Sequence, residues 1–214
     1  MEANEPAWFV LKTSTVHVLG GINCWQPYDF SEACTTCGAG AIALPPLIAD
    51  LNAMGKKDLD FTAHDGQIIV TRRVADALCE SQLTGFNIDS VRHHKKLDPD
   101  PRFAWLRIRS QWPAMHRNSI FEMGDPCPEC GRSGHCASRT HPIALWYPAP
   151  PRDAQDFNCT WEYWGIWNAP KKSTPNVGGA RLLIVSIRAR QFLTQLKIKR
   201  LRFEPIHFVN STAV

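Results

Sequence analysis

Two short motifs, CTTCG at residues 34–38 and CPECG at residues 127–131, decide how the rest of the chain is interpreted. Both have the form CxxCG, and they lie 93 positions apart. A glycine directly after a cysteine pair lets the chain turn back tightly, so each motif can present two thiolates from one loop. The repetition indicates that one ancestral unit occurs twice in the chain.

A second pair of matching blocks follows the motifs. The segment 68–73, IIVTRR, aligns with the segment 183–188, LIVSIR, and the match continues without a gap to Val91 and Ile206. These blocks are 115 positions apart, so the second copy contains an insertion between its motif and its block. The hydrophobic pattern of each block predicts a buried strand, a helix and a half-buried strand.

Turn and cap residues set the expected limits of these elements. Thr71 and, in the second block, Ser186 stand where an N-cap hydroxyl would accept a free amide of the first helical turn. Gly85 is placed to end the first helix in a left-handed conformation. Further strands are expected over residues 8–11, 16–19 and 103–109.

The repeats predict an α+β fold made of two related halves. Residues 1–97 form the first half, and residues 98–214 form the second, which carries a tryptophan-rich insertion. Each half combines a CxxCG zinc-knuckle hairpin with a strand–helix–strand unit. We expect the halves to pack as one compact domain, joined across a shared zinc site.

Composition excludes several classes of protein. The 214 residues are 44% hydrophobic and 21% charged, which is typical of a globular protein rather than a disordered one. A net charge of +4 does not require a nucleic-acid partner. The chain has no apolar run long enough for a membrane-spanning helix, and its acidic start lacks the pattern of a secretory signal. We therefore expect a cytoplasmic protein, in which eight cysteines indicate metal or redox chemistry rather than disulfides.

The four motif cysteines are the predicted metal ligands: Cys34, Cys37, Cys127 and Cys130. Structural zinc takes four soft donors in a tetrahedron, and two CxxCG loops supply that number. The pairs are much further apart in sequence than in the usual four-cysteine motif, but a duplicated fold would bring equivalent loops together. Two separate sites, the second completed by His135 or Cys136, and loops without metal are the alternatives.

Catalytic interpretations of the motifs fail on specific residues. A redox dithiol needs a cysteine at a helix start, and the residues after Cys37 and Cys130 are rich in glycine. The segment 126–130, PCPEC, matches half of the nucleobase deaminase signature, but no histidine is followed two positions later by glutamate. Other hydrolase, zinc-protease and phosphate-loop motifs are also absent from the sequence. We expect a protein without enzymatic activity.

Aromatic residues concentrate in the insertion of the second half. Trp161, Trp164 and Trp167 recur at three-residue spacing. They could plug the core or cover a zinc loop, or they could anchor a partner, because tryptophan buries much area with little loss of entropy. The basic residues of the last predicted helix and strand are best explained as a solvent-exposed face. We therefore do not favour a nucleic-acid-binding surface there.

The doubled CxxCG motif, the strand–Ser/Thr–helix–strand blocks and the closing segment 201–205, LRFEP, resemble one protein family. This is the double-CxxCG-motif family of bacterial immunity proteins, found beside swarming-inhibition toxins of myxobacteria and beside other polymorphic toxins. The resemblance implies a cytoplasmic, non-enzymatic antidote that binds and neutralises a cognate toxin, in some cases a nuclease, during competition between bacteria. The family's cysteines correspond to the four predicted zinc ligands.

A nuclease target raises a question of charge. An inhibitor that mimics nucleic acid should be acidic, whereas this chain is slightly basic. We would then expect steric occlusion, contact through local acids such as Asp50, Asp58 and Asp60, or binding away from the toxin's active site. The alternative function is that of a zinc-ribbon-like nucleic-acid-binding protein, and an enzyme of unknown class is a third.

Overall fold

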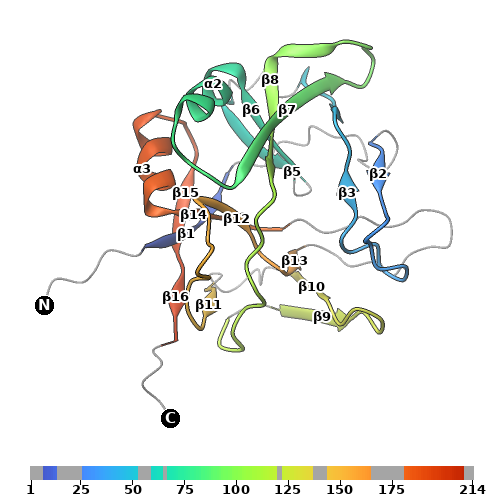
Figure 1. Cartoon of the computed structure of the whole chain (residues 1–214), viewed down its shortest axis with the longest axis vertical. Coiled ribbons are helices and arrows are strands. Elements are labelled where there is room, and N and C mark those ends of the chain that lie inside the picture. Colours follow the sequence, from blue (N-terminus) through green and yellow to red (C-terminus); the bar gives the residue numbers. More distant parts are fainter. Residues whose placement is uncertain are drawn as a thin grey trace, which may run out of the picture.

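A computed structural model of the protein describes residues 7–13, 26–52, 59–64, 67–119, 122–136, 144–164 and 181–209. In this part of the chain the fold is mixed α+β, with two helices and mostly short strands in five sheets (Figure 1). The predicted α+β class is therefore confirmed. The strand predicted over residues 16–19 lies outside the described residues.

The first layer is a five-stranded sheet with one helix against it. Its strand order is β4-β7-β8-β6-β5. The helix α2 contacts the central strand β8 and its neighbour β6. The elements of this layer are β4 (Leu47–Ala49), β5 (Phe61–His64), β6 (Gln67–Thr71), α2 (Arg72–Glu80), β7 (Phe86–His93) and β8 (Pro99–Ile108).

The second layer is a four-stranded sheet, ordered β12-β14-β1-β15, with helix α3 against β14 and β1. A parallel pair of short strands, β11 and β16, continues directly from it, because β16 follows β15 in the chain. The elements are β1 (Trp8–Lys12), β11 (Trp146–Tyr147), β12 (Phe157–Cys159), β14 (Leu183–Ser186), α3 (Ile187–Gln195), β15 (Arg202–Pro205) and β16 (His207–Phe208).

Both predicted strand–helix–strand blocks are present, as β6-α2-β7 and as β14-α3-β15. In each layer the two strands of the block do not pair with one another, because an antiparallel strand lies between them. That central strand is β8 in the first layer and β1 in the second. The predicted strands over residues 8–11 and 103–109 therefore form, and each pairs with strands on the other side of the proposed boundary at residue 97. Whether 1–97 and 98–214 are separate units stays a prediction.

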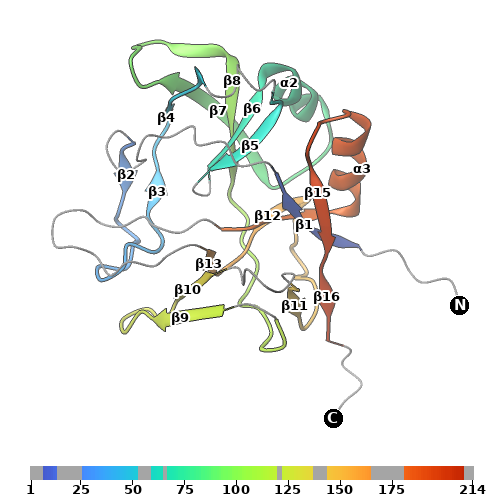
Figure 2. The ribbon, with the colours of Figure 1, turned by 180° about the vertical axis from the view of Figure 1, so that it is seen from behind.

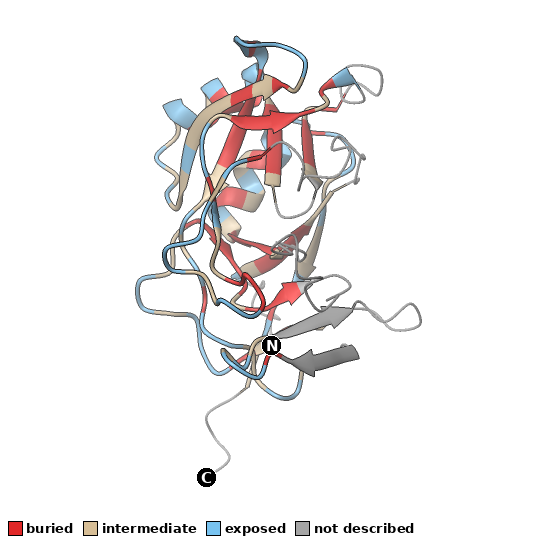
Figure 3. Ribbon diagram, turned by 90° about the vertical axis from the view of Figure 1, so that its right-hand side faces the viewer, coloured by how far each residue is buried: buried red, intermediate tan, exposed pale blue. Residues whose placement is uncertain are grey.

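The two layers share one hydrophobic core on their helix sides. The helices lie side by side in both views (Figures 1 and 2). Aligned residues of the two blocks meet in this core, among them Val70 with Val185 and Leu78 with Leu193. Strand residues facing the core are buried, whereas the outer sides of the helices are exposed (Figure 3). Burial of one amphipathic face per helix is the main source of stability for helices of this length.

The helix boundaries refine the sequence expectations. Ser186 caps α3 as predicted, since its Oγ accepts the Ala189 N–H at 3.1 Å. Thr71 occupies the cap position of α2, but its hydroxyl makes no capping bond, so that part of the prediction is wrong. Gly85 has the predicted left-handed conformation, with φ of +94°, but α2 already ends at Glu80, so Gly85 shapes the entry to β7 rather than the helix end.

Two hairpins carry the CxxCG motifs at a distance from the helices. The motif at 34–38 lies between the paired strands β2 (Tyr28–Asp29) and β3 (Ile42–Ala43). The motif at 127–131 lies between β9 (Glu122–Pro126) and β10 (Ser133–Cys136), and β13 (Tyr163–Trp164) pairs with β10 on its other side. Both loops project from the same end of the molecule (Figure 1).

Candidate metal centre

The two CxxCG loops have the same backbone conformation. In the first, the Gly38 N–H donates to the Cys34 carbonyl at 2.8 Å, and in the second the Gly131 N–H donates to the Cys127 carbonyl at 2.9 Å. The glycines have φ of +71° and +69°, a left-handed conformation that costs other residues about 1–2 kcal/mol. The glycine of each motif thus closes a turn that points both cysteine side chains the same way.

The four sulfurs form one cluster, as the shared-site prediction requires. The Sγ atoms of Cys34 and Cys127 are 3.8 Å apart, and those of Cys37 and Cys130 are 3.5 Å apart. All four lie within 4.8 Å of one another. Sulfurs around a tetrahedral zinc, with bonds of about 2.3 Å, would lie about 3.8 Å apart. The donor set and its spacing therefore fit a single zinc ion.

Equivalent cysteines face each other across this cluster. The first cysteine of one loop, Cys34, approaches the first cysteine of the other, Cys127, and the second cysteines approach in the same way. Cys37 and Cys127 are buried, whereas Cys34 and Cys130 are half-buried. A metal here would be closed to solvent on one side and would hold two hairpins that are far apart in sequence.

The surroundings of the cysteines shift the pKa values of their thiols in different directions. Although burial opposes ionisation, N–H groups of Cys130 and Glu129 lower the pKa of the Cys127 thiol to about 7. Burial raises the pKa of Cys37 well above its ordinary value. A divalent metal removes such differences because thiolate coordination deprotonates cysteine outright.

A carboxylate joins the two loops beside the sulfurs. Glu129, within the second motif, accepts the Thr35 hydroxyl at 2.9 Å and the Thr36 N–H at 3.0 Å. These bonds to Thr36 and Thr35 lower the pKa of Glu129 to about 2. The contact is exposed, so it aligns the loops without contributing much stability by itself.

An aromatic residue from the insertion, Tyr163, packs against the cysteine cluster. Tyr163 packs against Cys37, Cys127 and Ala39. Its hydroxyl accepts the Gly40 N–H at 3.1 Å, which fixes the end of the first loop. The guanidinium of Arg132 lies 5.8 Å from the centre of the Tyr163 ring. The insertion therefore forms part of the wall of the candidate metal centre.

The predicted tryptophan anchors are only partly described. Trp161 is half-buried, and the Arg132 guanidinium covers its ring at 5.1 Å. The backbone of Trp164 lies in β13, but its side chain and the whole of Trp167 are outside the described residues. The side chains of His135 and Cys136 are also outside them, although both residues lie in β10 next to the second loop.

A second group of possible ligands was not predicted from the sequence. Asp50, His93 and His94 present one donor atom each within 4.8 Å of one another, where β4 and β7 end side by side. Nδ1 of His93 accepts the Lys95 N–H at 3.1 Å, and its Nε2 lies 3.3 Å from the Asp50 carboxylate and 3.2 Å from the Asn52 side-chain nitrogen. Both ring nitrogens of His93 therefore already have protein partners, and we assign no metal to this group. In the sequence, the only indication of this group was the pair of adjacent histidines, His93 and His94.

Comparison with known proteins adds no family assignment. No protein-family model matches the chain, and no curated protein matches it. Among the described residues, neither helix has the length and apolar character needed to cross a membrane. The resemblance to double-CxxCG immunity proteins therefore remains a prediction from the motifs.

Proposed function

We propose that this protein is an immunity protein that binds and neutralises a cognate bacterial toxin, with one structural zinc holding its binding scaffold together. The carrying observation is the closed four-thiol cluster. Catalytic zinc sites keep a coordination position for water or substrate, whereas four cysteine sulfurs fill a tetrahedron. Such a centre favours a scaffold over an enzyme, in agreement with the family resemblance of the motifs.

We further propose that the fold is two related halves joined across this zinc. In support, each motif occupies the loop of a strand hairpin, and the hydrogen bonds of one loop recur in the other. Four thiolates and one metal would then link residues 34–37 to residues 127–130. Because metal binding to such sites contributes on the order of 10 kcal/mol, the link would dominate the stability of this end of the molecule.

An exposed apolar surface lies beside the first loop. Phe30, Ile42 and Leu44 are 40%, 51% and 40% exposed, and they belong to or flank the β2–β3 hairpin. Exposed apolar side chains beside such a loop favour protein–protein contact. Trp161, which is half-buried with the Arg132 guanidinium over its ring, is a further candidate contact residue from the second hairpin region.

Local acids are a weaker route to a nuclease toxin. Asp60 is engaged within the fold, where it accepts the Thr71 hydroxyl and pairs with Arg73 at 2.6 Å. Asp50 pairs with His93, and Asp58 lies outside the described residues. Among the proposed modes, we therefore favour steric occlusion over imitation of nucleic acid.

Zinc dependence tests the scaffold. We expect one zinc per chain by elemental analysis, and we expect Cys130→Ala to lose the metal and become insoluble or markedly heat-labile. Cys79→Ala is the matched control, because Cys79 is an exposed free cysteine on α2. Full metal content and stability in Cys130→Ala would contradict the shared site.

Co-expression tests the immunity function. The chain is produced with the product of the adjacent gene, and a one-to-one complex that survives gel filtration and restores growth is expected. Absence of a complex, together with salt-sensitive retention of RNA or DNA by the purified protein, would instead favour the zinc-ribbon-like nucleic-acid-binding alternative, because phosphate contacts weaken steeply with salt.

A further inference from the structure

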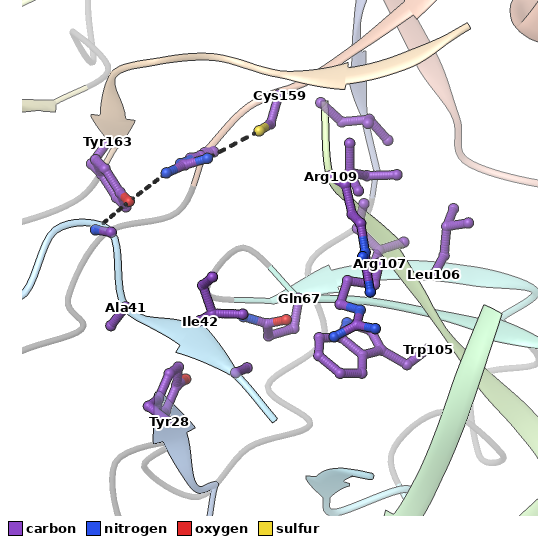
Figure 4. Close-up of a pocket in the computed structure, with 16 residues that line it drawn as sticks. Tyr28, Ala41, Ile42, Gln67, Trp105, Leu106, Arg107, Arg109, Cys159 and Tyr163 are labelled. Carbon is purple, nitrogen blue, oxygen red and sulfur yellow. Dashed lines mark hydrogen bonds between the residues drawn. The ribbon is translucent and has the colours of Figure 1, made fainter. Parts of the chain in front are cut away.

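A cleft opens between the β2–β3 hairpin, the end of β8 and Tyr163 (Figure 4). Its volume is about 510 Å³, which is within the range of small-molecule sites. Tyr28 and Ile42 lie on one side, and Arg107 and Arg109 lie on another (Figure 4). The cleft is therefore built from both layers and from the first CxxCG hairpin.

Arg181 is the central polar group of this cleft. One of its NH₂ groups donates to the Tyr163 hydroxyl at 2.7 Å, and the other donates to the Cys159 sulfur at 3.3 Å, bonds drawn as dashed lines in Figure 4. Its guanidinium lies 4.9 Å from the centre of the Tyr163 ring. These contacts fix the orientation of a half-buried cation and leave N–H donors for another acceptor.

Two further arginines come from one strand face. Trp105, Arg107 and Arg109 alternate along β8 and just past its end, so they point to the same side of the sheet. Arg107 lies over the Trp105 ring at 5.1 Å and pairs with Asp89 at 2.8 Å. Arg109 is exposed. The strand thus adds the ion-paired Arg107 and the exposed Arg109 to the wall opposite Tyr163.

Arg107 has Asp89 as its ion-pair partner, but no carboxylate balances Arg181 or Arg109 within the cleft. The described residues that line it include no aspartate or glutamate. In the described part of the chain, no carboxylate lies within ion-pair distance of Arg181 or Arg109. A guanidinium is charged at every physiological pH, and holding it partly away from water without an anion is unfavourable.

We propose that this cleft binds a small organic oxyanion, a phosphate or carboxylate carried on an apolar body. The anion would accept N–H groups of Arg181 and Arg109, since guanidinium binds such groups through paired hydrogen bonds. The apolar body would lie against Ile42 and Tyr28, which form the apolar side of the cleft. This site goes beyond the proposed toxin binding and does not depend on it.

Isothermal titration calorimetry with three probes tests the site on the full-length, zinc-loaded protein. Phenyl phosphate carries both the anion and the apolar ring, inorganic phosphate carries the anion alone, and phenol carries the ring alone. We expect phenyl phosphate to bind, inorganic phosphate to bind about tenfold more weakly, and phenol to give no heat. Added salt should weaken phenyl phosphate binding.

Variants locate the binding. Arg181→Gln and Arg109→Gln are each expected to weaken phenyl phosphate binding about tenfold or more, and Arg152→Gln, an exposed arginine outside the cleft, is expected to leave it unchanged. If Arg181→Gln fails to fold, Arg109→Gln decides, because the Arg109 side chain is exposed and makes no ion pair with the described residues. No heat with phenyl phosphate up to about 10 mM, or equal binding by the wild type and Arg109→Gln, would overturn the proposal.

Discussion

In the first layer the central strand β8 follows its neighbour β7 after a short turn, whereas in the second layer the central strand β1 comes from the opposite end of the chain from β15. Both central strands nevertheless pair in the same register. Leu106 of β8 faces Ile68, and Leu11 of β1 faces Leu183, which is the residue that aligns with Ile68. Side-chain pattern, rather than proximity in sequence, therefore sets the place of each strand.

A cross-strand ion pair recurs at the same place in both layers. Arg107 of β8 pairs with Asp89 of β7 at 2.8 Å, and Lys12 of β1 pairs with Glu204 of β15 at 2.5 Å. Because β1 belongs to the amino-terminal part and β8 to the carboxy-terminal part, each part supplies the centre of the other's sheet. Exchange of strands, together with the facing thiols, makes the two layers depend on one another.

The clearest difference between the layers lies just before the second strand of each strand–helix–strand block, that is, before β7 and before β15. Gly85 and the aligned Arg200 both have positive φ, +94° and +66°. A Cβ at position 85 would lie 2.1 Å from the Phe157 carbonyl oxygen, a backbone atom that cannot move easily. The first layer therefore requires glycine at this position, whereas the second layer accommodates a side chain.

Substitution at these two positions should have the largest effect. We expect Gly85→Ala to lower the free energy of unfolding by about 3 kcal/mol or more, through the clash and the left-handed backbone. Arg200→Gly should change it by less than about 1 kcal/mol, because relief of the backbone is offset by a more flexible unfolded chain. Urea unfolding measures both. Equal effects would mean that the two turns are not in different packing environments.

In each layer the hydroxyl at the helix start donates to an aspartate, which is a different residue in each case. Asp156 accepts the Ser186 hydroxyl at 2.6 Å and the Thr84 N–H at 3.1 Å, and its side chain is 7% exposed. Asp60 accepts the Thr71 hydroxyl at 2.9 Å, and its side chain is 27% exposed. The same residue type thus serves a buried network in one layer and a more exposed one in the other.

Removal of these carboxylates should give a smaller and unequal effect. Asp156→Ala leaves buried donors without acceptors, so we expect a loss of about 3 kcal/mol, against about 1 kcal/mol for Asp60→Ala, where water can replace the carboxylate. Thermal unfolding of the two variants at the same pH provides the comparison. A larger loss of stability in Asp60→Ala than in Asp156→Ala would show that the exposure of the carboxylate does not determine how much its removal destabilises the fold.

The repeated pattern allowed much of this fold to be predicted. The strand–helix–strand blocks follow from local hydrophobic periodicity, and the meeting of Cys34 with Cys127 follows from duplication and zinc chemistry. The position of β1 between β14 and β15 did not follow, because periodicity predicts a strand but not its partner. Thr71 makes no capping bond although its hydroxyl donates to Asp60 much as that of Ser186 donates to Asp156, so the sequence did not distinguish the two cap positions.

The cleft arginines were also beyond sequence analysis. Arg107 and Arg109 look like ordinary polar residues of a strand, and Arg181 adjoins a segment without a clear pattern. Only the packing of β8 against the first hairpin and Tyr163 brings them to one cavity. Asp89 pairs with Arg107, whereas no carboxylate of the described residues lies within ion-pair distance of Arg181 or Arg109, and no spacing rule reveals that difference.

The outer faces of the two layers bury their carboxyl groups to different extents. In the first sheet Asp89, opposite Trp105, is 23% exposed and pairs with Arg107. On the outer face of the first sheet, Ala49 of β4 packs in a cluster of buried apolar residues. On the outer face of the second, Tyr147 of β11 packs beside Trp112, and burial and the nearby charge of Glu162 raise the pKa of its hydroxyl. Glu162 is itself only 4% exposed, and its Oε1 accepts the Met115 N–H at 2.7 Å. The second face therefore contains a buried carboxyl.

Replacement of that carboxyl should give the smallest, pH-dependent effect. Burial raises the pKa of Glu162 above its ordinary value of 4.5, so the folded state binds more protons than the unfolded state above pH 4.5. Stability contributed by the neutral acid is present below that pH and is lost as pH rises through the folded-state pKa. Glu162→Gln keeps the acceptor for Met115 without the charge, so its melting temperature should exceed the wild type by about 2 °C or more at pH 8, and the two should converge near pH 4. A constant difference across this range would mean that Glu162 does not titrate with folding, and the contrast between the two outer faces would then be one of packing alone.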